Sequence, residues 1–184
     1  EILLAEVEKQ DDMKQALKAR MRNFHQNFIQ AAIDYMESGC YEEALGLLNI
    51  CDKEWPMLYY YRAECLYELG KEAEAKEMIA KADAADSYCC FPNRLEDIKV
   101  LELAMKLQPE FPKAYYYIGN LWYDKRQYEK AKEVWEKSAE LDNNFPTVFR
   151  NLSLIYYNKC QEPQKAKEVL EHAFALDTTD SRVF

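Results

Sequence analysis

The sequence predicts an all-α protein, an α-α superhelix in which about four pairs of antiparallel helices follow one another along the chain. One spacing of apolar and small residues occurs four times. Within each copy the apolar residues recur at steps of three, four and seven, which places them on one face of a helix. Of the 184 residues, 49% are hydrophobic and only 4 are Gly, so the chain can bury a sizeable core.

The third copy shows the repeated spacing most clearly. Counted from Tyr115, its marker residues follow after 3, 4, 7, 13, 16, 20 and 23 positions, at Ile118, Gly119, Trp122, Tyr128, Ala131, Trp135 and Ser138. A short turn separates the two helical stretches, so each copy predicts a helix hairpin. Small residues at equivalent places let the two backbones approach closely. These pairs are Ala32 with Ala44, Ala63 with Ala75, Gly119 with Ala131, and Ser153 with Ala166.

The elements are expected in a fixed order. They are an N-terminal helix at 2–21, repeat 1 at 24–55, repeat 2 at 56–87, an unpaired extra helix at 91–109, repeat 3 at 112–145, repeat 4 at 146–180, and the start of a truncated further repeat at 181–184. The extra helix should split the array into two pairs of repeats and change its path, because no first helix precedes it.

Three local details accompany these boundaries. The apolar face of the N-terminal helix consists of Ile2, Leu3, Val7, Met13, Leu17 and Met21. An interruption of this helix is expected near Asp11 and Asp12. The extra helix should bury Ile98, Leu101 and Ala104. Repeat 4 carries one additional residue, expected in the turn near Glu162 and Pro163.

The order aromatic, small, aromatic, Ala, large apolar, Ala over about 34 residues resembles the tetratricopeptide repeat, or TPR. The resemblance covers most of residues 24–180 and implies a right-handed solenoid with a concave and a convex face. The chain departs from the family pattern at the proline expected near the end of each unit. Prolines occur there only at Pro56 and Pro109, while Ser87, Asn143 and Thr178 stand elsewhere.

A narrower resemblance concerns the segments that begin at Phe91, Tyr115 and Phe145. They resemble a group of large bacterial proteins in which an uncharacterised β-rich domain precedes TPR repeats. This resemblance implies that the chain is the helical part of a longer protein, with both ends cut. It implies no chemistry.

Composition excludes several functions. Lys and Arg number 24 against 33 Asp and Glu, so the net charge of −9 lacks the basic footprint of a nucleic-acid binder. The four glycines, Gly39, Gly46, Gly70 and Gly119, form no Gly-rich phosphate loop. No apolar stretch approaches the roughly 18 residues that span a bilayer. Acidic side chains alternate with lysines on solvated helix faces, so we expect neither an enzyme nor a cofactor.

Cysteine and histidine patterns favour structural roles. The six cysteines follow no disulfide spacing and are typical of small buried residues in a reducing compartment, which predicts a cytoplasmic location. The adjacent Cys89 and Cys90 leave open a redox switch or soft-metal site, although a turn before the extra helix is the simpler interpretation. His25 and His172 lack metal-ligand spacing, so they are expected at the surface and no metal site is predicted.

A concave groove is the candidate binding site implied by the TPR resemblance. Its predicted lining is Tyr60, Glu64, Tyr67, Tyr116, Asn120, Tyr123, Arg150, Asn151 and Tyr157, with Ile29, Ile33 and Met36 in the first unit and Leu154 and Asn158 in the fourth. Successive helical residues point about 100° apart, so at least one tyrosine in each of the triplets 59–61 and 115–117 should face the groove or solvent. Alternatively, these tyrosines pack between neighbouring first helices. The repeat core should contain Tyr35, Tyr59, Tyr115, Tyr128 and Tyr156.

The sequence thus favours a non-catalytic scaffold whose groove binds a peptide or protein segment, from a partner or from a missing domain of the same chain. One alternative is a structural spacer that forms homo-oligomers through exposed end repeats. A second is a carbohydrate-binding module that uses tyrosines such as Tyr123, beside Trp122.

Overall fold

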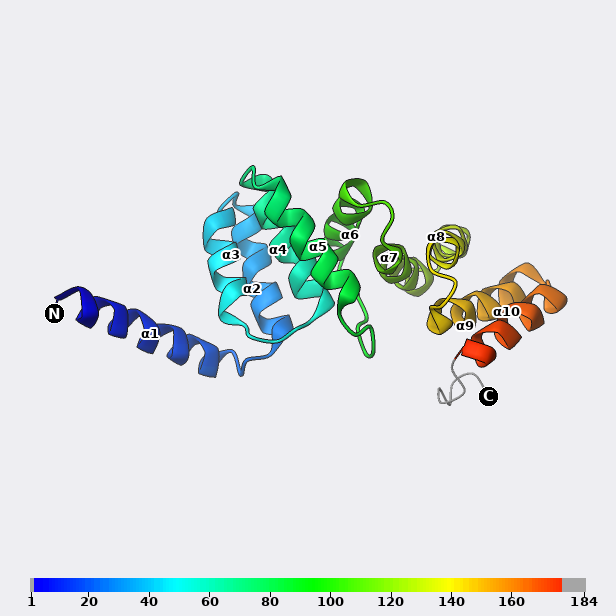
Figure 1. Ribbon diagram of the computed structural model, residues 1–184, viewed down its shortest axis with the longest axis horizontal. Helices are drawn as coiled ribbons and strands as arrows, with labels where there is room; N and C mark the ends of the chain where they lie inside the picture. Colours follow the sequence, from blue (N-terminus) through cyan, green and yellow to red (C-terminus); the bar gives the residue numbers. More distant parts are fainter. Residues whose placement is uncertain (1, 177–184) are drawn as a thin grey trace. The chain divides into compact units, whose positions relative to one another are not determined.

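The computed structural model describes residues 2–176, with side chains from residue 10 onward, and all regular structure in this range is helical (Figure 1). The helices are α1 (Ile2–Arg20), α2 (His25–Glu37), α3 (Tyr41–Ile50), α4 (Pro56–Glu68), α5 (Glu72–Ala84), α6 (Glu96–Leu107), α7 (Pro112–Asp124), α8 (Tyr128–Leu141), α9 (Pro146–Ile155), the π-helix η1 (Tyr156–Cys160) and α10 (Pro163–Leu176). The predicted all-α class is confirmed. The further repeat expected at 181–184 lies outside the described residues.

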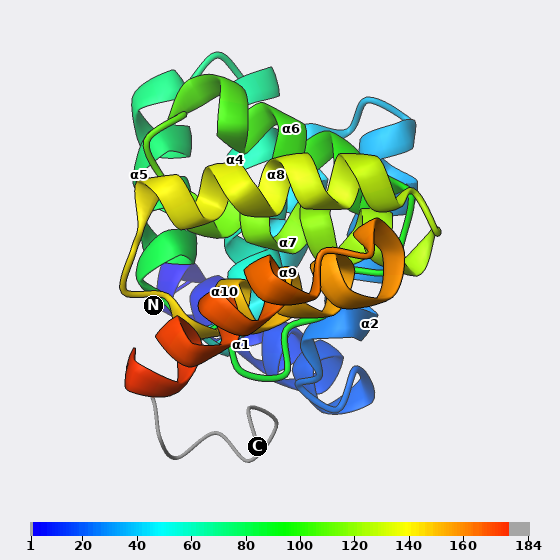
Figure 2. The same cartoon turned by 90° about the vertical axis from the view of Figure 1, so that its right-hand side faces the viewer.

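The chain divides into two compact units, with the boundary between Asp86 and Ser87. Unit 1 contains α1–α5, and unit 2 contains α6–α10. In unit 1 the hairpins are α2–α3 and α4–α5; in unit 2 they are α7–α8 and α9–α10. Figure 2 shows α8 lying along α7, and α10 along α9. These are the four helix pairs that the repeated spacing predicts.

The small residues at the hairpin crossings are buried as predicted, at Ala32, Ala44, Ala63, Ala75, Gly119, Ala131, Ser153 and Ala166. Proline supplies the first residue of α4, α7 and α9, where its fixed φ suits the helix and its missing N–H removes no bond. Acidic residues occupy the first turns of α3, α5 and α8, where they interact favourably with the helix dipole. Local sequence therefore favours the observed starts of these helices.

The turn inside every hairpin contains one residue with left-handed backbone. In repeats 1 and 2 this residue is Gly39 (φ 77°) and Gly70 (φ 75°), but in repeats 3 and 4 it is Arg126 (φ 59°) and Gln161 (φ 58°). The hydrogen bonds of repeats 2 and 3 match closely. Gly70 N donates to Tyr67 O at 2.9 Å, and Arg126 N donates to Tyr123 O at 3.0 Å. Such an ending stabilises the last carbonyls of a helix and favours glycine.

Arg126→Gly is therefore expected to raise the free energy of unfolding by about 0.5–1 kcal/mol, because glycine adopts this backbone without steric cost. The reverse change, Gly70→Ala, should lower it by about 1 kcal/mol. A Cβ at Gly70 would meet no atom within 4 Å, so the effect there is confined to the backbone. Urea denaturation followed by circular dichroism measures both changes; a destabilised Arg126→Gly would contradict this interpretation of the turns.

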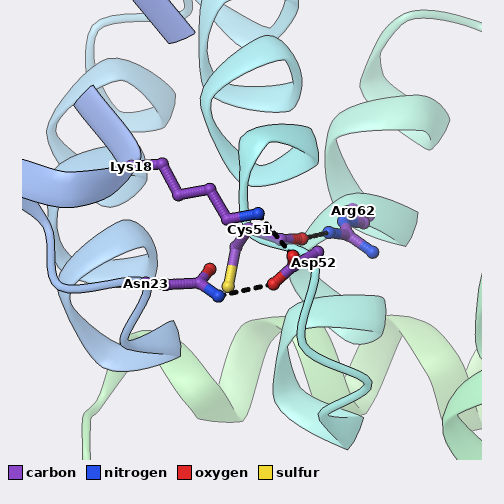
Figure 3. A network of polar contacts seen from close by, with 5 residues as sticks. All are labelled: Lys18, Asn23, Cys51, Asp52 and Arg62. Atoms are coloured by element: carbon purple, nitrogen blue, oxygen red, sulfur yellow. Dashed lines mark hydrogen bonds and ion pairs between the residues drawn. The ribbon is translucent and has the colours of Figure 1, made fainter. Parts of the chain in front are cut away.

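Helix α1 is continuous, so the interruption expected near Asp11 and Asp12 is wrong. Polar contacts join its C-terminal end to the loop between α3 and α4 (Figure 3). Lys18 forms an ion pair with Asp52, and Asn23 Nδ2 donates to Asp52 Oδ1 at 2.5 Å. The hydrogen bonds from Lys18 and Asn23 lower the pKa of the Asp52 carboxyl, which keeps it ionised near neutral pH.

Arg62 of α4 closes the C-terminal end of α3 (Figure 3). Its Nη2 donates to Leu48 O at 2.7 Å and to Cys51 O at 2.8 Å. The last carbonyls of a helix have no partner within the helix, so a side-chain donor stabilises them. Burial lowers the pKa of the Arg62 guanidinium. A single side chain thus ties hairpin α2–α3 to hairpin α4–α5.

The extra helix, α6, packs against α7, as α3 packs against α4 and α8 against α9. It therefore takes the place of a second helix without a first, in agreement with the prediction of an extra helix that belongs to no hairpin. Asp97 holds the segment before it, accepting from the backbone N–H groups of Asn93 (2.8 Å) and Arg94 (3.0 Å). Of its predicted apolar residues, Leu101 and Ala104 are buried.

The extra residue of repeat 4 lies at the end of the first helix and not in the turn near Glu162 and Pro163. Residues Tyr156–Cys160 form a turn of π-helix, which is wider than an α-turn and accommodates an inserted residue. The predicted position was wrong because Gln161, Glu162 and Pro163 resemble a turn sequence. Wider turns of this kind are frequent at functional sites.

Several burial predictions need correction. Among the tyrosines expected in the core, Tyr156 is buried, Tyr59, Tyr115 and Tyr128 are half-buried, and Tyr35 is 46% exposed. Both histidines pack against rings and are not simply surface residues. His25 stacks on Trp55 with centroids 4.2 Å apart, and His172 meets Phe149 edge to face at 4.5 Å. The six cysteines are free thiols, of which Cys51, Cys65 and Cys90 are buried and Cys89 is exposed.

Candidate functional site

The groove predicted for unit 1 is largely filled. Tyr60 is 1% exposed and Glu64 is 2% exposed, while Tyr67 is half-buried. The apolar residues expected to line the first unit, Ile29, Ile33 and Met36, are all buried. These positions pack inside the unit, where α2 contacts α4. The prediction that Tyr60 and Glu64 line an open groove is therefore wrong.

Tyr116 in unit 2 is also a packing residue, at 4% exposure. Its ring meets Phe145 edge to face at 4.8 Å, and its carbonyl accepts a hydrogen bond from Trp135 Nε1 at 3.1 Å. Each tyrosine triplet does leave one member half-exposed, but that member is Tyr59 or Tyr115. Predicting Tyr116 in the groove was wrong because Phe145, in the loop before α9, covers it.

Tyr123 and Trp122, at the end of α7, contact side chains of α8 in the same hairpin. The ring of Tyr123 lies 5.3 Å from Tyr128 and 5.5 Å from Trp135, and Tyr123 is half-buried. The ammonium of Lys130 lies 4.7 Å from the centroid of Trp122, which is a cation–π geometry. These contacts leave little free aromatic face for sugar stacking at this pair.

The structure brings three predicted residues into one hydrogen-bonded chain across α7 and α9. Arg150 Nη1 donates to Asn151 Oδ1 at 3.1 Å, and Asn151 Nδ2 donates to Asn120 Oδ1 at 3.0 Å. Asn151 is buried, whereas Asn120 and Arg150 are half-buried. These two hydrogen bonds fix the orientation of both asparagine amides and hold the Nη1 group of the Arg150 guanidinium. We call Asn120, Asn151 and Arg150 the amide–arginine cluster.

Two donors of this cluster remain without an acceptor among the described residues. They are Asn120 Nδ2 and Arg150 Nε, and both atoms are buried. A buried donor without a hydrogen bond costs about 1–3 kcal/mol, so these atoms mark where an acceptor from a ligand would be most favourable. Beside them on α9 and η1, Leu154 and Asn158 are exposed, and Tyr157 is 66% exposed. Donors and apolar surface therefore occur together.

A hydrogen bond from Tyr156 to Glu136, which the sequence did not predict, supports the π-helix η1 that carries Tyr157 and Asn158. Tyr156 donates to Glu136 Oε1 at 2.5 Å, while Lys165 lies 3.4 Å from that oxygen and 4.1 Å from the Tyr156 ring centroid. Burial, and then the hydrogen bond to Glu136, raises the pKa of Tyr156. The phenol therefore stays protonated and donating at neutral pH. No spacing rule could have found this contact, because it depends on the π-helix.

Among the side chains that the structure describes, those of residues 10–176, no group of three His, Cys, Asp or Glu could hold a metal ion. None of the helices that the structure describes combines the length and apolar character needed to cross a membrane.

The four hairpins have small buried residues at equivalent crossing positions. Such a repeated hairpin defines a helical-repeat protein of the solenoid class. The amide–arginine cluster lies on the first helices of two of these hairpins, α7 and α9. Residues 112–145, which form α7 and α8, match the family model described as tetratricopeptide repeat. The predicted resemblance to the tetratricopeptide repeat is thus confirmed for residues 112–145.

The solved structures that are similar to this chain include the following three. The crystal structure of MamA is 17% identical, with 92% of this chain and 87% of that chain covered and a TM-score of 0.46. YrrB, described as a TPR protein with an unusual peptide-binding site, is 19% identical (92% and 95% covered, TM-score 0.44). TTC0263, described as a thermophilic TPR protein in Thermus thermophilus, is 16% identical (87% and 95% covered, TM-score 0.42).

Proposed function

We propose that the chain is a non-catalytic scaffold, and that the face of unit 2 carrying the amide–arginine cluster binds an extended segment of another protein. Repeat arrays of this type generally act through such surfaces. The single observation that carries the proposal is the cluster itself, in which Asn120 Nδ2 and Arg150 Nε are oriented donors without acceptors among the described residues. A cytoplasmic location, favoured by the six free thiols, belongs to the same proposal.

The geometry favours a ligand with a carboxylate. Asn151 holds Nη1 of Arg150, which leaves Nε and Nη2 as the two donors of the opposite edge. Two parallel N–H donors match the two oxygens of a carboxylate, from an acidic side chain or a chain terminus. Asn120 Nδ2 would take a main-chain carbonyl of the same segment. Leu154 and the ring of Tyr157 would contact an apolar side chain next to it.

A peptide library tests this assignment by isothermal titration calorimetry. The probes are synthetic peptides with a free C-terminal carboxylate, the same peptides amidated, and peptides with internal Asp or Glu. Against the best binder, Arg150→Gln should weaken binding 10-fold or more, because a charged hydrogen bond contributes about 1.5–3 kcal/mol. Tyr157→Ala should also weaken binding. The Tyr116→Ala variant is unsuitable because it would disturb packing against Phe145.

Two matched variants control this experiment. Lys167→Gln removes an exposed charge on α10, and Tyr35→Ala removes an exposed tyrosine on α2; neither should change the affinity. Thermal melts by circular dichroism show whether each variant remains folded. If folded Arg150→Gln binds as tightly as the original chain, or if no carboxylate-bearing peptide binds at all, the assignment of the amide–arginine cluster is wrong.

A further inference from the structure

Helix α1 of unit 1 is largely uncovered along its described side chains, and it takes no part in the peptide site proposed for unit 2. Figure 1 shows α1 extending away from the α2–α3 hairpin. Between residues 10 and 20 its side chains are exposed except for half-buried Leu17 and Lys18. Met13, a large apolar side chain, is 65% exposed. A helix whose described side chains are so little covered is marginal in water unless something packs against it.

The sequence of α1 contains the register of a coiled-coil seam. Positions separated by alternating steps of four and three fall on one narrow stripe of a helix. On this stripe stand Leu3, Val7, Gln10, Lys14 and Leu17 of α1, followed by Met21. In chain order, the stripe is apolar, apolar, polar, polar, apolar, apolar. Read from Met21 back to Leu3, the order of apolar and polar residues is the same, so the stripe is symmetric about its centre in its pattern of polarity.

That symmetry suits antiparallel pairing of two identical helices. Leu3 of one copy is level with Met21 of the second copy, Val7 with Leu17, and Gln10 with Lys14, so apolar residues meet apolar ones at every outer layer. A parallel pair would instead place Lys14 against Lys14 of the second copy, which is repulsive. In the antiparallel pair a flanking position brings Glu6 opposite Arg20 of the second copy, an attractive charge pair.

The described structure provides an independent feature at the C-terminal end of this stripe. An open hollow of about 410 Å³ is lined by Leu17, Arg20, Met21 and Asn27. Asn27 Nδ2 donates to Met21 O at 2.9 Å, which fixes the wall of the hollow against the start of α2. The antiparallel register brings the N-terminal apolar positions of the second copy to this hollow. We propose that α1 binds α1 of a second copy of this chain, antiparallel, to form a homodimer.

Charge exchange tests both the partner and its direction. Wild-type chain should show a mass that rises with concentration from 21.8 kDa toward twice that value in sedimentation equilibrium. Arg20→Glu brings two glutamates opposite each other, and Glu6→Arg brings two arginines opposite each other, so each variant alone should remain monomeric where wild type dimerises. An equimolar mixture of the two variants restores both opposite-charge pairs and should recover the dimer mass. A parallel pair does not place these two positions opposite each other, so it predicts no recovery.

Asp12→Arg is the matched control, because it reverses an exposed charge on the outer face of the same helix and should leave dimerisation unchanged. Circular dichroism verifies that the variants retain their helices. Three results would overturn the proposal. They are a wild-type chain that stays monomeric at every concentration, single variants that dimerise as wild type does, and a mixture that fails to recover the dimer.

Discussion

Gly119→Ala is expected to lower the free energy of unfolding by about 3 kcal/mol, at the upper end of the usual range for overpacking a core. A Cβ at this position would lie 2.3 Å from Trp135 Nε1 and 2.4 Å from its Cδ1. The indole cannot easily move aside, because it is 3% exposed and Nε1 donates to Tyr116 O at 3.1 Å. Urea denaturation followed by circular dichroism measures the loss.

The other hairpins show how this clash can be relieved. At the place of Gly119 they carry Ala32, Ala63 and Ser153, and at the place of Trp135 they carry Leu48, Ile79 and Leu170. A side chain larger than glycine is thus accommodated where the partner is smaller than tryptophan. Trp135→Leu alone should cost about 2–4 kcal/mol by leaving a cavity. Gly119→Ala added to Trp135→Leu should cost little more, so the two changes should couple by at least about 1 kcal/mol. Strictly additive losses would show that the indole does not limit position 119.

Arg62→Met is expected to lower the free energy of unfolding by about 2–4 kcal/mol. Methionine keeps much of the apolar stem but removes the donor that satisfies Leu48 O and Cys51 O. Each carbonyl left without a hydrogen bond at a partly buried helix end costs about 1–3 kcal/mol. Water that reaches these carbonyls reduces this cost. The effect should be seen in unit 1, because both carbonyls belong to hairpin α2–α3 and the loop after it, and the donor belongs to α4.

Two further variants show whether the loss in Arg62→Met comes from the hydrogen bonds of the guanidinium. Arg62→Lys retains the charge but offers a compact ammonium in place of a planar fork, so an intermediate loss is expected. Lys53→Met removes an exposed charge close to the same loop and should change stability by less than about 0.5 kcal/mol. Equal losses for Arg62→Met and Lys53→Met would mean that the contacts of Arg62 with these carbonyls do not stabilise the fold.

The helix hairpins could be predicted because apolar periodicity is a property of the chain alone. Ala44 and Ala75, for example, lie at the crossing of their hairpins, as their spacing indicates. The groove was predicted less well, since periodicity assigns a residue to a face but does not say what covers that face. Tyr116 has the right position for a groove residue, yet Phe145, 29 positions later, buries it.

The stripe proposed on α1 combines apolar and polar residues. A search among apolar residues alone does not find the regular positions of Gln10 and Lys14 between Val7 and Leu17. A search for alternating steps of three and four, whatever the residue type, finds the stripe. The pairing of Asn120 with Asn151 likewise depends on how two helices face each other, which spacing within either helix cannot give.

The stacking of His25 on Trp55 has a consequence for observing how the protein folds. Trp55 lies in unit 1, whereas Trp122 and Trp135 lie in unit 2, so each unit carries its own fluorophore. The imidazole of His25 lies 4.2 Å from the indole of Trp55, so the emission of Trp55 depends on whether this contact in unit 1 is intact. Trp135 is buried and lies 5.5 Å from the ring of Tyr123, so its emission depends on the packing of hairpin α7–α8. The indoles thus give each half of the chain a fluorescent reporter of its own packing.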